Sequence, residues 1–204
     1  MARSHADGLI HGTTLFVSLL TVTIGISGCS RESDVSQQAS TAAQAQRGGP
    51  FTLIDTSGRT VTNETLKGKP YAIFFGFTRC PDVCPTTMAR MALLHQRLGS
   101  KANRLNMVFV SVDPDHDKPE DIRSFLSMFD APVMGLTGTP QQLAAMEKAY
   151  RIYVEKVPLP SGDYTIDHSA QILLFDRHGN FAGMMDSHAP LDQATAQLRR
   201  LIDA

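Results

Sequence analysis

Residues 71–85 read YAIFFGFTRCPDVCP, and this stretch decides the fold of the chain. Its first part, Tyr71–Phe75, is a short apolar run that predicts a buried strand, and Thr86–Leu98 beyond it predicts a helix. Cys80 and Cys84 therefore lie at a strand-to-helix junction, where backbone amides and the helix dipole favour the thiolate form of cysteine. A pair of thiolates either takes part in disulfide exchange or holds a soft metal ion.

The composition is typical of one globular domain with additional segments. The chain has 204 residues, of which 42% are hydrophobic, and its formal net charge is −1. This apolar fraction supports an ordinary core and excludes both a disordered chain and a multi-span membrane protein. Because the charges are nearly balanced, no basic surface for nucleic acid is expected, and nucleic acid is not among the predicted partners.

The N-terminal residues 1–28 have the character of a signal peptide. Residues 14–26 are uncharged and mostly apolar, and they lead into Ile26-Ser27-Gly28-Cys29, which resembles the lipobox of bacterial lipoproteins. We expect cleavage before Cys29 and attachment of lipid to it. The alternative is an uncleaved single span over residues 9–28, barely long enough at roughly 20 residues to cross a bilayer. Both anchors place the rest of the chain outside the cytoplasm, at a bacterial cell membrane.

Residues 29–50 predict a flexible tether between the anchor and the domain. They consist mostly of Ser, Gln, Ala, Thr and Gly, with almost no large apolar side chain, so they cannot bury enough surface to fold. The folded domain is therefore expected to occupy residues 51–204.

Within the domain, predicted strands alternate with predicted helices. A β-hairpin is expected around Thr56-Ser57-Gly58 at the start of the domain. Further strands are expected at residues 71–78, 105–112, 133–136, 171–175 and 181–185, and helices at residues 86–98, 119–129, 140–150 and 191–202. This order predicts an α/β fold. With two cysteines after the first central strand, it resembles a thioredoxin-like fold with an added N-terminal β-hairpin.

The cysteine spacing departs from the Cys-x-x-Cys motif of thioredoxin-type oxidoreductases, because three residues separate Cys80 from Cys84. If Cys80 caps the helix, Cys84 lies one turn further along on the same face, and both sulfurs can point at one spot in solvent. This spacing still permits a disulfide, and it also suits a clamp of two thiolates on a metal ion.

Two other features favour a metal. Arg79 stands where Trp commonly precedes the first thioredoxin cysteine, and His168, rather than Pro, precedes the strand that faces the motif in such folds. A neutral imidazole beside two thiolates supplies a third ligand, and a Cys2His set can hold both Cu(I) and Cu(II). The prediction for His168 depends on the fold, since a lone histidine in a loop is more often an ordinary loop residue.

Four blocks of sequence resemble the Sco/SenC family of copper-binding assembly proteins for cytochrome c oxidase. In family order they are GFTRCPDVCP at residues 76–85, SVDP and DKP within 111–119, GLTG at 135–138 and DYTIDHS at 163–169. The resemblance implies Cys80, Cys84 and His168 as copper ligands. It also implies a membrane-anchored periplasmic domain that delivers copper toward the CuA centre of an oxidase subunit, or that reduces the cysteines of that centre.

Residues near the predicted ligands each have two interpretations. Asp82 either tunes the metal site or only favours the start of a helix through the dipole. Asp167 either orients His168 through the second ring nitrogen or is a surface carboxylate of a loop. Other polar residues are interpreted as loop, helix-start or surface groups: Asp113, Asp115, His116 and Asp117.

The sequence leaves rival functions open, including whether the protein has enzymatic activity. A dedicated thiol–disulfide reductase needs Cys80 and Cys84 but not His168, and its partner would be a periplasmic thiol reductant instead of a copper donor. A peroxiredoxin-like peroxidase is suggested by Thr78 near Cys80, but the distant Arg that activates such thiolates is not identified. A structural disulfide gains little stability across so short a loop, and structural zinc normally has four protein ligands.

Overall fold

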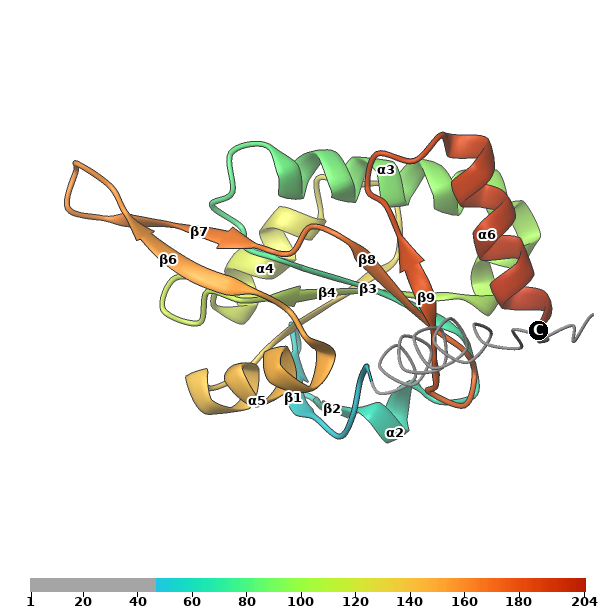
Figure 1. Ribbon diagram of the computed structural model, residues 1–204, viewed down its shortest axis with the longest axis horizontal. Helices are drawn as coiled ribbons and strands as arrows, with labels where there is room; N and C mark the ends of the chain where they lie inside the picture. Colours follow the sequence, from blue (N-terminus) through green and yellow to red (C-terminus); the bar gives the residue numbers. More distant parts are fainter. Residues whose placement is uncertain (1–46) are drawn as a thin grey trace, which may run out of the picture.

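The structure is a computed structural model that describes residues 47–204 (Figure 1). The predicted signal peptide, the lipidation site Cys29 and most of the predicted tether lie outside the described residues. Among those that are described, no helix combines the length and the apolar character needed to cross a membrane.

A seven-stranded sheet forms the centre of the fold, with the strand order β2-β1-β5-β4-β3-β8-β9. Strands β3, β4 and β5 are parallel, whereas β1 and β8 run antiparallel to their neighbours β5 and β3. The strands are Thr52–Asp55 (β1), Thr60–Thr62 (β2), Tyr71–Gly76 (β3), Asn106–Ser111 (β4), Val133–Thr137 (β5), Ile172–Phe175 (β8) and Phe181–Met185 (β9). The predicted α/β class and the added N-terminal hairpin are confirmed.

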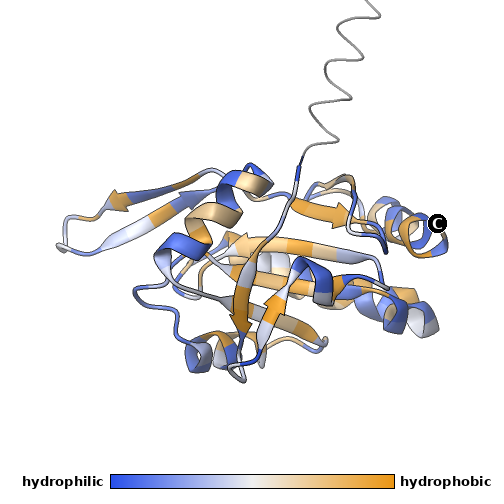
Figure 2. Ribbon diagram, turned by 90° about the horizontal axis from the view of Figure 1, so that it is seen from below, coloured by the Kyte–Doolittle hydropathy of each residue, from blue (hydrophilic) through white to orange (hydrophobic). Residues whose placement is uncertain are grey.

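Strand β3 lies inside the sheet, between β4 and β8, and both of its faces are covered. All six of its residues are buried, as the continuous apolar run predicts. At its first residue the ring of Tyr71 stacks on Phe175 of the antiparallel neighbour β8, with centroids 4.9 Å apart. Hydrophobic residues follow the strands of the sheet in Figure 2. The chain leaves the C-terminal end of this buried strand at Gly76 and continues into the loop that carries the cysteines.

Helices cover both faces of the sheet. Helices α3 and α6 pack against each other on one side, and α5 lies on the opposite side (Figure 1). Helix α4 packs so closely on β5 that a Cβ atom at Gly135 would collide with Ile122. The helices are Asn63–Leu66 (α2), Val83–Leu98 (α3), Pro119–Leu126 (α4), Pro140–Tyr150 (α5) and Leu191–Asp203 (α6), with a 3-10 turn at Gly99–Arg104 (η1).

Helix α3 begins earlier than the sequence predicts, at Val83 instead of Thr86. Its N-cap is Asp82, so the condition under which Cys80 would cap the helix is not met. Pro85 falls in the first turn, where proline is tolerated because the amides of that turn have no partner within the helix. Cys84 therefore belongs to the first turn of α3, and Cys80 belongs to the loop before it.

A two-stranded arm, absent from the predicted elements, projects from the body of the domain (Figure 1). It pairs β6, Val154–Pro158, with β7, Tyr164–His168, in antiparallel register. We define the arm as residues 154–168. Its strands lack a continuous apolar run, and only Ile166 among their residues is buried. A local hydrophobic pattern therefore could not predict it.

Contacts with the domain already begin before Phe51. The Gly48 amide donates a hydrogen bond to the Ala149 carbonyl at 2.9 Å. The Arg47 guanidinium donates to the Tyr150 carbonyl at 3.1 Å. These contacts attach the start of the described chain to the end of α5. The division into signal peptide, tether and domain stays a prediction.

Candidate metal centre

The cysteine loop connects the end of β3 to the start of α3. Cys84 is fully buried and Cys80 is half-buried, and both thiols are free. The Cys84 backbone amide donates to the Cys80 sulfur at 3.4 Å. At the end of β3, a Cβ atom on Gly76 would lie 2.9 Å from the Cys84 sulfur, so the absence of a side chain there leaves the thiol its space.

His168 reaches the cysteines from the last position of β7. Its Nδ1 lies 3.0 Å from the Ser169 carbonyl oxygen, and its Nε2 lies 3.5 Å from the Cys84 sulfur. Because a carbonyl oxygen only accepts hydrogen bonds, Nδ1 carries the proton in the neutral ring. The lone pair of Nε2 is therefore directed toward the thiols, as a metal ligand requires.

Two phenylalanine rings hold the imidazole edge-on. The ring centroids of Phe74 and Phe77 lie 6.0 and 5.9 Å from that of His168, at interplanar angles of 68° and 84°. Both phenylalanines are buried and come from β3 or the residue after it. The apolar strand that predicts the fold thus also forms one wall of the site.

The structure brings the three predicted ligands together. The two sulfurs and a ring nitrogen of His168 all lie within 4.8 Å of one another. Two soft thiolates with one imidazole of defined tautomer form a donor set that fits copper in either oxidation state. In the described part of the chain, no other three His, Cys, Asp or Glu side chains bring their ligand atoms this close together.

The two thiols differ in acidity. A hydrogen bond from Cys84 lowers the pKa of Cys80 to about 4, against the opposing effect of burial. The same sulfur–sulfur contact raises the pKa of Cys84, and burial raises it further. These opposite shifts favour a pair with one thiolate, at Cys80, and one thiol, at Cys84. A metal ion that takes both sulfurs must displace the remaining proton.

The two carboxylates singled out from the sequence lie at the surface. Asp82 is exposed, and its carboxylate is 3.4 Å from the Thr86 hydroxyl within the first turn of α3. Asp167 is also exposed. The contact to the second nitrogen of His168, which is one of the two interpretations of Asp167, is made by the Ser169 carbonyl.

Asp117, taken from the sequence as a loop or helix-start carboxylate, instead anchors the cysteine loop. It is buried and accepts hydrogen bonds from the Thr78 amide at 2.9 Å and from the hydroxyls of Thr78 and Ser111 at 2.6 Å each. Burial raises the pKa of Asp117, although these hydrogen bonds oppose the shift. Its partner Thr78 is distant in sequence, so local patterns did not reveal the contact.

The comparisons with known proteins agree with this geometry. A family model described as SCO1/SenC matches residues 39–203. The chain belongs to the SCO1/SenC family. Among family members, Protein SenC of Rhodobacter capsulatus is 37% identical over 164 residues, which cover 80% of this chain and 74% of SenC. The resemblance seen in the sequence is thereby confirmed.

Solved structures of the family share the fold. The copper-bound structure of Bradyrhizobium japonicum ScoI is 44% identical, with a TM-score of 0.72, and covers 76% of this chain and 99% of that one. Full-length relatives can be longer. The chain spans 48% of the mitochondrial SCO1 homolog 1 of Arabidopsis thaliana, to which it is 32% identical over 78% of its own length.

Proposed function

We propose that this SCO1/SenC protein is a copper metallochaperone that binds Cu(I) and Cu(II) through Cys80, Cys84 and His168. The observation that carries the proposal is the convergence of two sulfurs and an imidazole nitrogen within 4.8 Å. The family of copper-binding cytochrome c oxidase assembly proteins, and the copper-bound ScoI structure, support copper as the cargo. The acceptor in this proposal is the oxidase subunit that carries the CuA centre.

The unequal thiols suit the transfer of a metal ion. Cys80 is half-buried and already ionised near neutral pH, so it makes the first contact with incoming copper. Cys84 then loses its proton as the second sulfur binds, and His168 adds its Nε2. On release, Cys84 recovers a proton readily because its pKa is raised. Protonation of Cys84 therefore favours transfer of the ion to the thiolates of an acceptor.

The anchor belongs to the same proposal. Lipid attachment at Cys29, or a single span over residues 9–28, would hold the domain at the outer side of the cell membrane. The tether would let the site reach an acceptor embedded in that membrane. We expect the full-length protein in the membrane fraction, with its domain in the periplasm.

A thiol–disulfide reductase is the second candidate function. The low pKa of Cys80 favours it, because the attacking group in disulfide exchange is a thiolate. This function would keep the cysteines of the CuA subunit reduced, and it does not need His168. The role of His168 therefore separates the two functions.

The deciding experiment is an anaerobic copper titration of the reduced full-length protein in detergent. We expect one copper per chain and an intense thiolate-to-Cu(II) absorption band. His168→Ala should weaken Cu(II) binding and change the band, because the third ligand is lost. His178→Ala is the matched control, since His178 is exposed and lies in the turn between β8 and β9.

The alternative outcome is equally specific. If His168→Ala leaves both copper affinities unchanged, the Cys2His site is refuted. If the parent binds no copper tightly and a Cys80–Cys84 disulfide forms and is reduced readily, the protein is a thiol reductase. Reduction of a CuA-subunit disulfide would then proceed at the parent rate in His168→Ala.

A further inference from the structure

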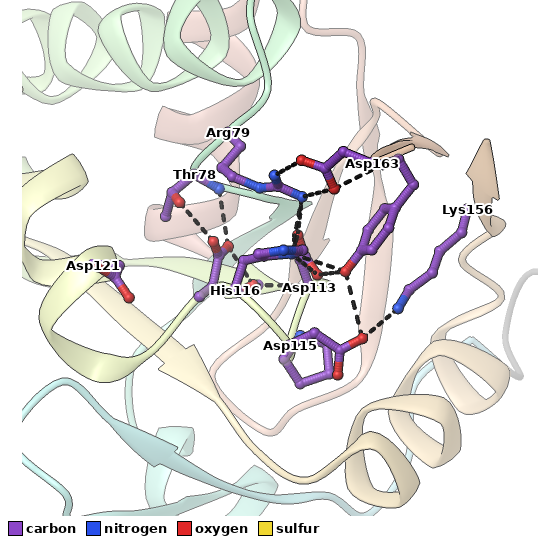
Figure 3. Close-up of polar contacts among 12 residues, drawn as sticks. Thr78, Arg79, Asp113, Asp115, His116, Asp121, Lys156 and Asp163 are labelled. Atoms are coloured by element: carbon purple, nitrogen blue, oxygen red, sulfur yellow. Dashed lines mark hydrogen bonds and ion pairs between the residues drawn. The ribbon is translucent and has the colours of Figure 1, made fainter. Parts of the chain in front are cut away.

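A cluster of polar side chains joins the arm to the cysteine loop (Figure 3). Its residues come from three segments that are distant in sequence: the cysteine loop, the loop after β4, and the arm, including the turn at the tip of the arm. We call four of its members the arm latch. They are Arg79, Asp113, Asp163 and Tyr164.

Tyr164 and Asp113 form the interior half of the latch. The Tyr164 hydroxyl donates to an Asp113 carboxylate oxygen at 2.5 Å, and the Asp113 side chain is 0% exposed. The same hydroxyl lies 2.9 Å from Nδ1 of His116, whose ring centroid is 5.1 Å from that of Tyr164. A hydrogen bond to a buried carboxylate is among the stronger ones in proteins, so this contact fixes the end of the β6–β7 ladder that lies next to the tip turn.

Arg79 forms the outer half and immediately precedes Cys80. Its guanidinium pairs with Asp163 at 2.6 Å and with Asp113 at 3.6 Å. The same group lies over the Tyr164 ring, 5.4 Å from the centroid. Arg79 of the cysteine loop thus contacts two side chains of the arm, the carboxylate of Asp163 and the ring of Tyr164.

The strand geometry of β7 connects the latch to the metal centre. Tyr164 is the first residue of β7 and His168 is the last. Alternate residues of a strand face the same side, so the two side chains share one face. Five paired positions tie β7 to β6, from Pro158 opposite Tyr164 to Val154 opposite His168. Because these pairings join the two strands along their whole length, a contact that holds Tyr164 also restrains His168.

We propose that Arg79 and Tyr164 are positioning residues that hold the arm closed over the cysteine loop, so that His168 meets the thiols. This inference rests on the proposed copper site. The latch should matter more for Cu(II) than for Cu(I), since two soft thiolates already suit Cu(I), whereas Cu(II) gains more from the imidazole. Opening the latch removes His168 from the site and leaves the cysteines in place.

Tyr164→Phe is the sharpest test because it removes a single hydroxyl. In the full-length protein we expect Cu(II) affinity to fall roughly tenfold and the charge-transfer band to change, with a smaller fall in Cu(I) affinity. Tyr153→Phe makes the same chemical change beside the arm, at an exposed residue outside the latch, and should leave both affinities at the parent value. Arg79→Ala should resemble Tyr164→Phe, and Arg79→Lys should restore part of the loss.

A double-mutant cycle distinguishes positioning from general damage. In a His168→Ala background, Tyr164→Phe should cause no further loss of Cu(II) affinity, because the only ligand that the latch positions is already gone. An equal further loss in that background, or an unchanged Cu(II) affinity in Tyr164→Phe alone, overturns the proposal. Equal losses of Cu(I) and Cu(II) affinity overturn it as well.

A measurement without copper keeps the latch testable if the proposed function fails. Amide hydrogen exchange in the metal-free protein should become faster in residues 164–168 after Tyr164→Phe, but not after Tyr153→Phe. Unchanged exchange in Tyr164→Phe shows that no latch exists. Faster exchange in a protein that binds no copper shows a latch that serves another function of the site.

Discussion

At the scale of single residues, environment separates two identical side chains. Cys80 and Cys84 are both cysteines four positions apart, yet one is half-buried in a loop and the other is fully buried in the first turn of α3. Their contact stabilises one negative charge instead of two, because a second thiolate would be repelled by the first. Cys80, the less buried of the two, carries that charge.

The pH dependence of alkylation measures this difference. Because the pKa of Cys80 lies at about 4, its thiolate is present throughout the neutral range. We expect iodoacetamide to modify Cys80 before Cys84, at a rate nearly constant between about pH 6 and 8. An ordinary thiol gains about tenfold per pH unit there. Mass spectrometry of peptides from the reduced protein assigns each rate.

The unfolded protein is the control for this experiment. In denaturant both cysteines should react equally and faster with rising pH, since their shared environment is lost. A Cys80 rate that rises steeply with pH in the folded protein would contradict the assigned thiolate.

At the scale of elements, the β1–β2 hairpin depends on one aspartate. Asp55 ends β1, is buried, and accepts hydrogen bonds from the Ser57 amide at 2.8 Å and hydroxyl at 2.7 Å. The Arg59 side chain and amide donate to it as well, at 2.8 and 3.0 Å. Burial alone raises the pKa of Asp55, but these hydrogen bonds outweigh burial and lower it to about 2.

Asp55→Asn should therefore destabilise the domain in a pH-dependent way. The folded pKa of Asp55 is below its ordinary value of 3.8, so its stabilising effect is full above about pH 4 and is lost as the pH falls through about 2. We expect a loss of about 1–3 kcal/mol at neutral pH by urea unfolding. The difference in the free energy of unfolding between the parent and Asp55→Asn should become smaller in acid.

Asp192→Asn is the matched control for the hairpin. The Asp192 side chain is 95% exposed and pairs with Arg97 on the surface, so its loss should change stability little. Equal effects of the two substitutions would mean that the hydrogen bonds of Asp55 do not stabilise the hairpin.

At the scale of the whole molecule, the candidate metal centre joins distant parts of the chain. Cys84 and His168 are separated by 84 positions in sequence. One comes from the body of the domain and the other from the projecting arm (Figure 1). An ion held by both connects the arm to the body, as the arm latch does beside it. Such an ion would bind the folded chain more tightly than the unfolded one, because only folding brings Cys84 and His168 together.

Thermal unfolding tests this connection. Copper at about a hundred times its dissociation constant should stabilise the fold by about 2.7 kcal/mol, which raises Tm by roughly 5–10 °C. Removing the ion with a chelator should reverse the gain. With Cu(II), the gain should be much smaller in His168→Ala and unchanged in His178→Ala. An equal gain in all three proteins would show that the ion does not connect the arm to the body.

The sequence by itself determined the class of fold and the candidate ligands. The buried strand before Cys80 and the alternation of strands with helices can be predicted locally. The hydrophobic pattern of neighbouring residues indicates which segments are buried strands and which are helices. The motif around Cys80 and Cys84 and the block that contains His168 likewise identified the family. Element boundaries were less certain, since Val83 rather than Thr86 begins α3.

Only the tertiary structure decided how these parts act together. The arm, the Ser169 carbonyl behind His168 and the buried Asp113 depend on contacts between residues far apart or on chain geometry without an apolar pattern. The division of charge between the cysteines also depends on burial and on the direction of one hydrogen bond. These properties arise only when the chain folds, because they depend on contacts between residues and not on any one stretch of sequence.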